Sequence, residues 1–179
     1  MSLKPSYYIY LVSSLPALQF GMKSPISFDK FLATCRELLS EKEAELIASA
    51  SISGNYPYTE GVNETLHRWW DFDTSLRNEL VKIRAPRKKA DPYKYLRMDG
   101  HPGHPAIYHA ALAAHRSHSV QDAEKILDSE RWKALDEFTA GHYFDLDFLI
   151  AYAHKLLILK RWETAEAPDR EAVLEEALA

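Results

Sequence analysis

The stretch that most constrains this fold runs from Phe144 to Trp162, FDLDFLIAYAHKLLILKRW. Apolar side chains recur there at steps of three and four, the spacing of a helix with a wide inward face. These side chains are Phe148, Leu149, Ile150, Tyr152, Ala153, Leu156, Leu157, Ile158 and Leu159. The sequence therefore predicts a central core helix on which only Lys155, Lys160 and Arg161 reach water.

The same stretch, about 19 residues long, approaches the length of a membrane span. His154, Lys155 and the closing Lys160–Arg161 pair would be costly in lipid, so we interpret it as a core helix of a soluble protein. The apolar run near the N-terminus contains tyrosines and Pro16 and has no small-residue cleavage site after it. That run is therefore a poor match to a signal peptide.

Length and composition indicate one folded domain. A chain of 179 residues can bury a substantial core, and a content of six glycines argues against a loop-rich all-β design. The single cysteine, Cys35, excludes an internal disulfide framework and fits a reducing cytoplasm. Cys35 also lies on the apolar stripe of its predicted helix, where a thiol usually acts as a small hydrophobe.

Capping and turn signals divide residues 1–179 into an all-α, single-domain bundle of about seven or eight helices around the central one. Tyr7–Val12 has strand-like composition, but we interpret it as a helix ending before Pro16 because the rest of the chain is helical. Capping signals mark three further helix starts: Ser27 before 28–39, the capping box Ser40–Glu43 before a helix that runs through Ala50, and Ser119 before 120–141. The remaining predicted helices are 60–84, 106–115 and an acidic terminal helix in 168–179.

Charge is distributed unevenly along the chain. The net charge is -4, yet residues 82–97 hold seven basic residues and one acid, a net +6, which leaves -10 for the rest. Residues 87–105 are rich in proline and have no core-forming pattern, so they predict a flexible basic loop. A protein that mainly holds nucleic acid is more often basic overall, so a solvated loop, or one that docks onto an acidic partner, is the preferred interpretation and nucleic-acid binding the alternative.

Histidines raise a second alternative, a metal-dependent hydrolase. The candidate ligands are His101, His104, His109, His115 and His118. Metal sites need three or four converging ligands, usually with a carboxylate, and these histidines fall in a proline-rich loop and at a helix end without such a pattern. We therefore expect surface or capping roles for them and predict no metal and no cofactor.

Two aspartate pairs were weighed for acid–base chemistry. Asp71 pairs with Asp73 and Asp145 with Asp147, each two residues apart at a predicted helix start, which favours capping. No Gly-x-Ser-x-Gly elbow and no phosphate-cradling glycine loop occur in the sequence. The adjacent Trp69 and Trp70 point about 100° apart on one helix, so core packing is favoured for them and a partner anchor stays open.

Three blocks carry a resemblance. They are YYIYLVSSLPAL from Tyr7, FDTSLRNELVKIRA from Phe72 and RWKALDEFTAGHYFDLDFLIAYAHKLLILKRW from Arg131. They resemble a bacterial family of unknown function whose genes lie among those for the subunits of V/A-type ATP synthases. The pattern is also distantly similar to the C (or d) subunit of the V/A-type ATPase, in which an aspartate precedes an asparagine-leucine-arginine helix; here Asp73, Leu76, Arg77 and Asn78 are comparable in a different order.

The resemblance implies a non-enzymatic interaction protein, a central-stalk component or assembly factor of a bacterial V/A-type ATP synthase. Such a protein would be cytoplasmic, without membrane insertion of its own, and peripheral to the membrane through the rotary complex. We expect it to contact ATP synthase subunits by surface complementarity. The predicted contact residues are Asp71, Asp73, Arg77, Asn78, Arg84, Arg87, Lys88 and Lys89.

Overall fold

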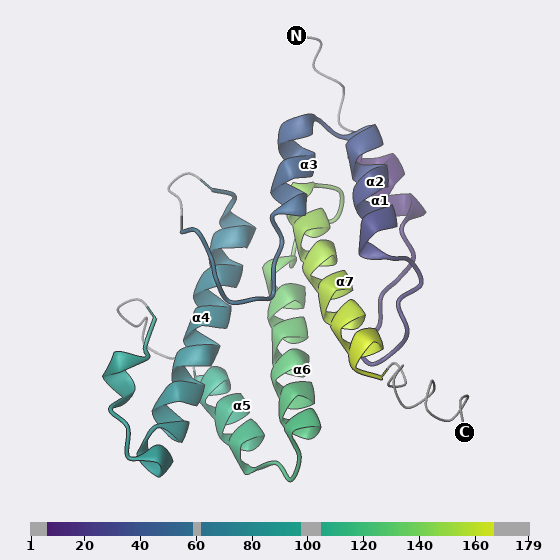
Figure 1. Cartoon of the computed structure of the whole chain (residues 1–179). Helices are drawn as coiled ribbons and strands as arrows, with labels where there is room; N and C mark the ends of the chain where they lie inside the picture. Colours follow the sequence, from purple (N-terminus) through teal and green to yellow (C-terminus); the bar gives the residue numbers. More distant parts are fainter. Residues whose placement is uncertain (1–6, 59–61, 98–104, 167–179) are drawn as a thin grey trace, which may run out of the picture.

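The computed structural model of this chain describes residues 7–58, 62–97 and 105–166 (Figure 1). This part of the chain contains seven α-helices, two short 3-10 helices and no strand, which confirms the predicted all-α, single-domain fold. The helices are α1 (Tyr8–Ser14), α2 (Phe28–Leu38), α3 (Glu41–Ala48), α4 (Glu64–Arg84), η1 (Pro86–Lys88), η2 (Pro92–Lys94), α5 (Pro105–Arg116), α6 (Val120–Phe138) and α7 (Leu146–Glu166).

Helix α7 is the predicted central helix. It lies between the α2–α3 pair and α6 (Figure 1), and it also contacts α4. Its buried residues are Leu149, Ile150, Ala151, Tyr152, Ala153, His154, Leu156, Ile158 and Leu159. Lys155 departs from the prediction, since its side chain is only 16% exposed and its amino group binds Asp136 and lies over the ring of Trp132.

A second, smaller core joins α4, α5 and α6. Helix α5 contributes small side chains, and the neighbouring helices contribute leucines, so the three helices pack closely. The buried members are Leu76, Leu80, Ile107, Ala110, Ala111, Ala114, Ala123 and Leu127. This core holds the C-terminal half of α4 against the N-terminal half of α6, which positions the charged residues described below.

Helix starts follow the predicted caps. The hydroxyl of Ser27 accepts the backbone N–H of Lys30, and Ser40 and Glu43 form the predicted capping box. Ser119 caps α6 by accepting the N–H of Asp122. These side chains satisfy backbone donors that have no partner inside the helix, so local sequence fixes where α2, α3 and α6 begin.

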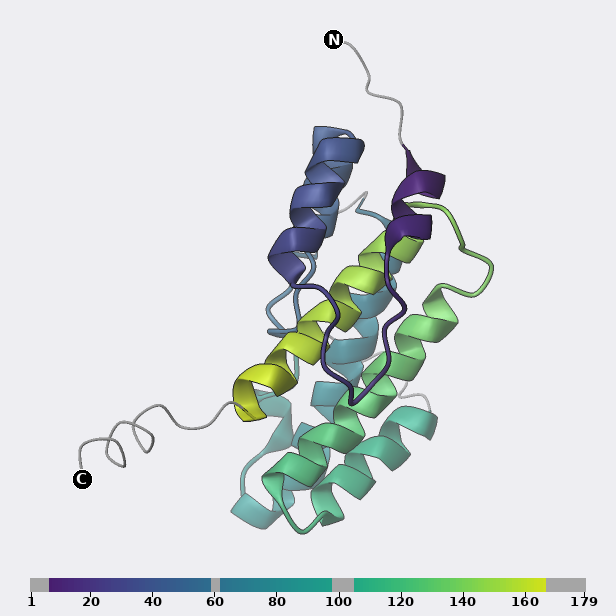
Figure 2. The same ribbon diagram turned by 90° about the vertical axis from the view of Figure 1, so that its right-hand side faces the viewer.

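The connection between α1 and α2 crosses the faces of α6 and α7 (Figure 2). The hydroxyl of Tyr152 on α7 donates to the carbonyl oxygen of Pro16 at 2.8 Å. Further along the connection, the ring of Phe20 packs against Trp132 of α6 with centroids 5.6 Å apart. The N-terminal segment is thereby attached to the last two described helices, and the short apolar run at Tyr8–Ser14 is a helix, as predicted.

The predicted helix start at Asp71 and Asp73 is wrong. Helix α4 begins at Glu64, because the side chain of Asn63 accepts the backbone N–H of Leu66 and caps it there. Both aspartates therefore lie in the interior of α4. By contrast, the prediction holds for Asp145, whose carboxylate accepts the backbone N–H of Phe148 at the start of α7.

Other predictions fall partly outside the described residues. In the 87–105 segment predicted as a flexible loop, residues 87 and 88 belong to η1 and residues 92–94 form η2, whereas residues 98–104 lie outside the described part, as does the predicted terminal helix 168–179. Trp69 and Trp70 are both buried, which confirms the core interpretation. Among the described helices, none is long and apolar enough to cross a membrane.

We expect Leu149→Ala to lower the free energy of unfolding by about 2–5 kcal/mol, because it leaves a cavity at a fully buried position of α7. Urea unfolding followed by circular dichroism measures this change. Val120→Ala is the control, since the valine is 81% exposed and should change the stability by less than about 0.5 kcal/mol. Similar losses in the two variants would show that α7 is not central to the core.

Candidate functional site

Asp73 is a buried carboxylate in the middle of α4. Its Oδ1 accepts the Nε–H of Arg131 at 2.7 Å, and its Oδ2 accepts the Nε–H of Arg77 at 2.6 Å. The hydroxyl of Tyr56 also donates to Oδ2, at 2.7 Å. A buried carboxylate is stable only when such charged and hydrogen-bonding partners replace water. Asp73 therefore holds the 51–58 segment and α6 against α4.

The balance of forces on Asp73 keeps it ionised. Burial disfavours the carboxylate, but the guanidinium groups of Arg131 and Arg77 outweigh that effect and hold the pKa of Asp73 below its usual range. Burial and the neighbouring carboxylate act together on Tyr56 and raise the pKa of its phenol. Tyr56 therefore remains a neutral donor to Asp73 at physiological pH.

A second buried carboxylate, Asp128, extends this arrangement to α7. Its Oδ1 accepts Nη1–H of Arg131 at 2.9 Å, and its Oδ2 accepts the indole N–H of Trp162 at 2.9 Å and a bond from Arg161. Although burial opposes the charge on Arg131, Asp73 and Asp128 raise the pKa of its guanidinium. We call Asp73, Asp128, Arg77, Arg131 and Arg161 the charge network.

A cavity of about 540 Å³ lies beside the charge network. It is lined by residues of α4, of the η1–η2 segment, of α6 and of α7. They are Arg77, Asn78, Leu80, Val81, Arg84, Ala85, Lys88, Ala90, Tyr95, Arg97, Glu124, Leu127, Arg131 and Arg161. Six of the lining residues are basic and one, Glu124, is acidic, so the cavity favours an anion.

Half of these cations have no acidic partner in the described part of the chain. Arg77, Arg131 and Arg161 are paired within the charge network. Arg84, Lys88 and Arg97 are exposed, and among described residues no carboxylate lies within 4.0 Å of their cationic groups. Their charge is therefore available to a ligand or partner.

The 51–58 and 86–97 segments are attached to the cavity wall by specific contacts. Arg77 donates to the carbonyl oxygen of Ile52 at 2.9 Å, and Arg97 donates to that of Gly54. Gly54 has a φ of +81°, and a Cβ there would lie 2.5 Å from the guanidinium of Arg77. A glycine is therefore required for this close approach.

Asn78 fixes the far end of the basic segment. Its side-chain oxygen accepts the backbone N–H of Arg97 at 2.9 Å, and its side-chain nitrogen donates to the carbonyl oxygen of Arg97 at 2.7 Å. This paired contact imitates a backbone ladder and places Arg97 at the cavity. The basic side chains of the lining supply charged hydrogen-bond donors, which suit the binding of an anion.

The structure brings four of the predicted contact residues together at the cavity: Arg77, Asn78, Arg84 and Lys88. Asp73 and Asn78 are buried and bonded internally, so neither side chain is presented to a partner as predicted. Asp71 Oδ2 lies 3.1 Å from Nδ1 of His67 on the same helix. Arg87 and Lys89 are exposed outside the cavity lining.

Sequence reasoning missed Asp128, Arg131 and Arg161. A signal for the first two was present, since Asp128 and Arg131 are spaced with Leu127 and Leu135 on the inward face of α6. Charged residues at inward positions of an amphipathic helix indicate buried pairing.

The alternative hypothesis of a histidine metal site gains no support from the histidines that the structure describes. His101 and His104 lie outside the described part of the chain. His109, His115 and His118 belong to no group of three ligands with metal-binding spacing among the described residues. Surface positions of His109 and His118 agree with the interpretation that was preferred for them.

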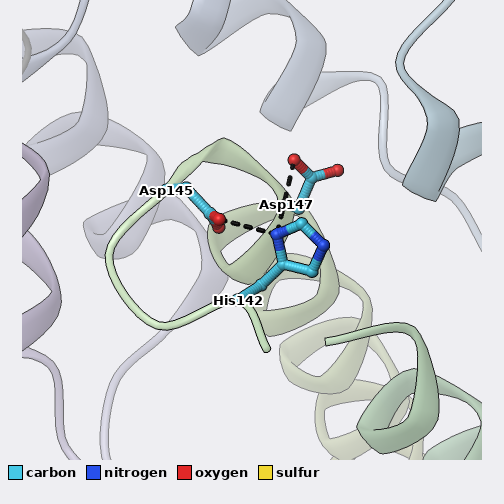
Figure 3. A group of neighbouring side chains, drawn as sticks. All are labelled: His142, Asp145 and Asp147. Atoms are coloured by element: carbon cyan, nitrogen blue, oxygen red, sulfur yellow. Dashed lines mark hydrogen bonds and ion pairs between the residues drawn. The ribbon is translucent and has the colours of Figure 1, made fainter. Parts of the chain in front are cut away.

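A different group, His142 with Asp145 and Asp147, has ligand spacing (Figure 3). His142 Nδ1 lies 2.6 Å from Asp145 Oδ2 and 3.9 Å from Asp147 Oδ2. Each carboxylate also binds the protein: Asp145 caps α7, and Asp147 accepts bonds from Asn63 and Thr65. The hydrogen bond to Asp145 raises the pKa of His142. This group is explained as a helix cap with a paired imidazole.

His154 is fully buried in α7. Its Nδ1–H donates to the carbonyl oxygen of Ile150 at 2.8 Å, and its ring lies 4.6 Å from that of Trp69. The Nε2 atom has no hydrogen-bond partner among the described residues. Burial lowers the pKa of His154 to about 4, against opposing effects of the Ile150 bond and of Asp73.

No family model matches this chain, and comparisons with curated proteins and with solved structures also found no match.

We expect Asp73→Asn to lower the free energy of unfolding by about 3–5 kcal/mol, because it leaves buried Arg131 with one carboxylate in place of two. Chemical unfolding at neutral pH measures the loss. Asp71→Asn makes the same chemical change two residues away on α4 and should cost less than about 1 kcal/mol, since its side chain is 29% exposed. Equal losses would remove the special role given to Asp73.

Stability should fall between pH 6.5 and pH 4 because of His154. In that window the unfolded chain takes up a proton that the folded chain, with a pKa of about 4, does not, so acid favours unfolding by about 3 kcal/mol. His154→Gln should flatten this part of the stability profile, measured by urea unfolding at several pH values. His118→Gln, which makes the same chemical change at an exposed position, is the matched control. A profile unaltered by His154→Gln would contradict the assignment.

Proposed function

We propose that this chain is a non-enzymatic interaction protein that binds an acidic surface of a partner. The observation that carries the proposal is a basic surface next to the end of α4, formed by Arg84, Arg87, Lys88, Lys89 and Lys94. All five side chains are exposed, and none has a carboxylate within 4.0 Å among the described residues. The rest of the chain is acidic, so these cations repel few neighbours and attract acidic partners.

The basic surface is held in an ordered turn. Pro86 starts η1 directly after α4, and Lys89 closes it in the left-handed conformation with a φ of 52°. The backbone N–H of Ala90 then bonds the carbonyl oxygen of Ala85 at 3.1 Å. A backbone fixed in this way loses little conformational entropy on binding, which favours specific docking.

The resemblance of three sequence blocks supports a partner of one kind, the subunits of a bacterial V/A-type ATP synthase. On this proposal the chain is a central-stalk component or an assembly factor of that complex. The basic surface would meet an acidic patch on a stalk subunit, and charge complementarity would set the orientation of docking. The association would place the chain at the cytoplasmic side of the membrane through the complex.

The test is affinity purification of the tagged full-length chain from its source cell, followed by mass spectrometry. ATP synthase subunits should be recovered with the parent chain and reduced at least about tenfold with the triple variant Arg87→Glu, Lys89→Glu and Lys94→Glu, since each reversed contact costs about 1 kcal/mol or more. The matched control Lys30→Glu, Arg36→Glu and Lys42→Glu makes the same charge change on exposed positions of α2 and α3.

The control variant should retain the subunits, because its changes lie away from the basic surface. Purification of the parent chain without any ATP synthase subunit would overturn the choice of partner. Equal loss in both triple variants would overturn the role of the basic surface, because it would mean that only the overall charge matters.

A further inference from the structure

We propose that the cavity between α4, the η1–η2 segment and α6 is a binding site for a small organic phosphate of the nucleotide class. The cavity is lined by cations without a carboxylate partner among the described residues, by guanidinium groups that buried carboxylates hold in place, and by apolar side chains. This goes beyond docking to a protein surface and does not depend on it.

The buried carboxylates position the guanidinium groups of Arg77 and Arg131 without using all their donors. In Arg131, Nε binds Asp73 and Nη1 binds Asp128, while Nη2 has no acceptor among the described residues. In Arg77, Nε donates to Asp73 and Nη2 donates to the carbonyl oxygen of Ile52. Nη1 of Arg77 also has no acceptor among the described residues. Donors fixed before a ligand arrives bind it at a lower entropic cost.

The cavity carries an excess of positive charge. Six basic residues line the cavity. Three of these charges are offset by carboxylates. Glu124 lines the cavity, and Asp73 and Asp128 are buried next to the arginines that line it. The remaining excess of three positive charges suits a ligand that carries several negative charges on one group. Phosphate and pyrophosphate meet this requirement, and planar guanidinium groups bind their oxygens in pairs.

Part of the cavity lining is apolar. Leu80, Ala85 and Leu127 are buried side chains that line the cavity, and Tyr95 lines it with a side chain that is 60% exposed. A volume of about 540 Å³ lies within the range of small-molecule sites, which are mostly apolar with a few fixed polar groups. The phenol ring of Tyr95 offers a surface on which an aromatic base can stack. An inorganic anion alone would leave this wall unused.

Binding is tested by isothermal titration calorimetry of the full-length chain with ATP, pyrophosphate and inorganic phosphate. We expect ATP to bind most tightly and inorganic phosphate most weakly, with affinities that fall as salt is raised. The cavity variant Arg84→Glu with Lys88→Glu should weaken ATP binding at least about tenfold, because two charge-assisted contacts are lost. Both side chains are exposed, so the variant should keep the unfolding midpoint of the parent.

Two further variants separate a built site from diffuse attraction. Arg87→Glu, Lys89→Glu and Lys94→Glu change more charge outside the cavity lining and should weaken ATP binding less than about threefold. Tyr95→Ala should weaken ATP binding while leaving pyrophosphate binding unchanged, because only ATP carries a base.

Three results would overturn the proposal. They are the absence of binding by ATP and pyrophosphate at millimolar concentration, equal weakening by the cavity variant and the Arg87–Lys89–Lys94 variant, and binding of a polyglutamate peptide without binding of either phosphate compound. The affinity-purification test uses cations outside the cavity lining, so the proposed function and the nucleotide site can be refuted independently.

Discussion

The burial of Asp73 is the constraint on which the rest of this structure depends. A carboxylate without water must be matched by fixed donors, and here the donors come from three separate segments: Tyr56 before α4, Arg77 on α4 and Arg131 on α6. Asp128 repeats the arrangement toward α7 through Arg161 and Trp162. The apolar cores bring these helices together, and the buried charges fix how they are aligned.

The same guanidinium groups serve the fold and the cavity. Arg77 and Arg131 each contact a buried carboxylate on one side and line the cavity on the other. Replacing such a network by apolar side chains often costs a protein no stability. Three arginines beside the cavity place fixed positive charge there in addition to their part in the fold.

Much of the fold could be predicted from the sequence because its signals are local. Ser40 and Glu43 fix a helix start by contacts within four residues, and the apolar spacing of 144–162 identifies the central helix. The candidate site is harder to predict from the sequence. Asp73 resembled a capping residue because its partner Arg131 is 58 positions away, and sequence spacing carries no information on such a contact. Residues 82–97 were recognised as basic, but the cavity they border depends on how α4 and α6 pack.

The position of α7 at the centre of the core has a consequence for synthesis. Helices α2 and α3 leave the ribosome before α7, yet the apolar surface that packs against both of them belongs to that last described helix. The crossing of residues 15–27 over α6 and α7 adds contacts of the same long range, such as that between Tyr152 and Pro16. The apolar faces of α2 and α3 therefore stay exposed to solvent until α7 has been synthesised. Chaperones bind nascent chains at such a stage, and truncated chains aggregate.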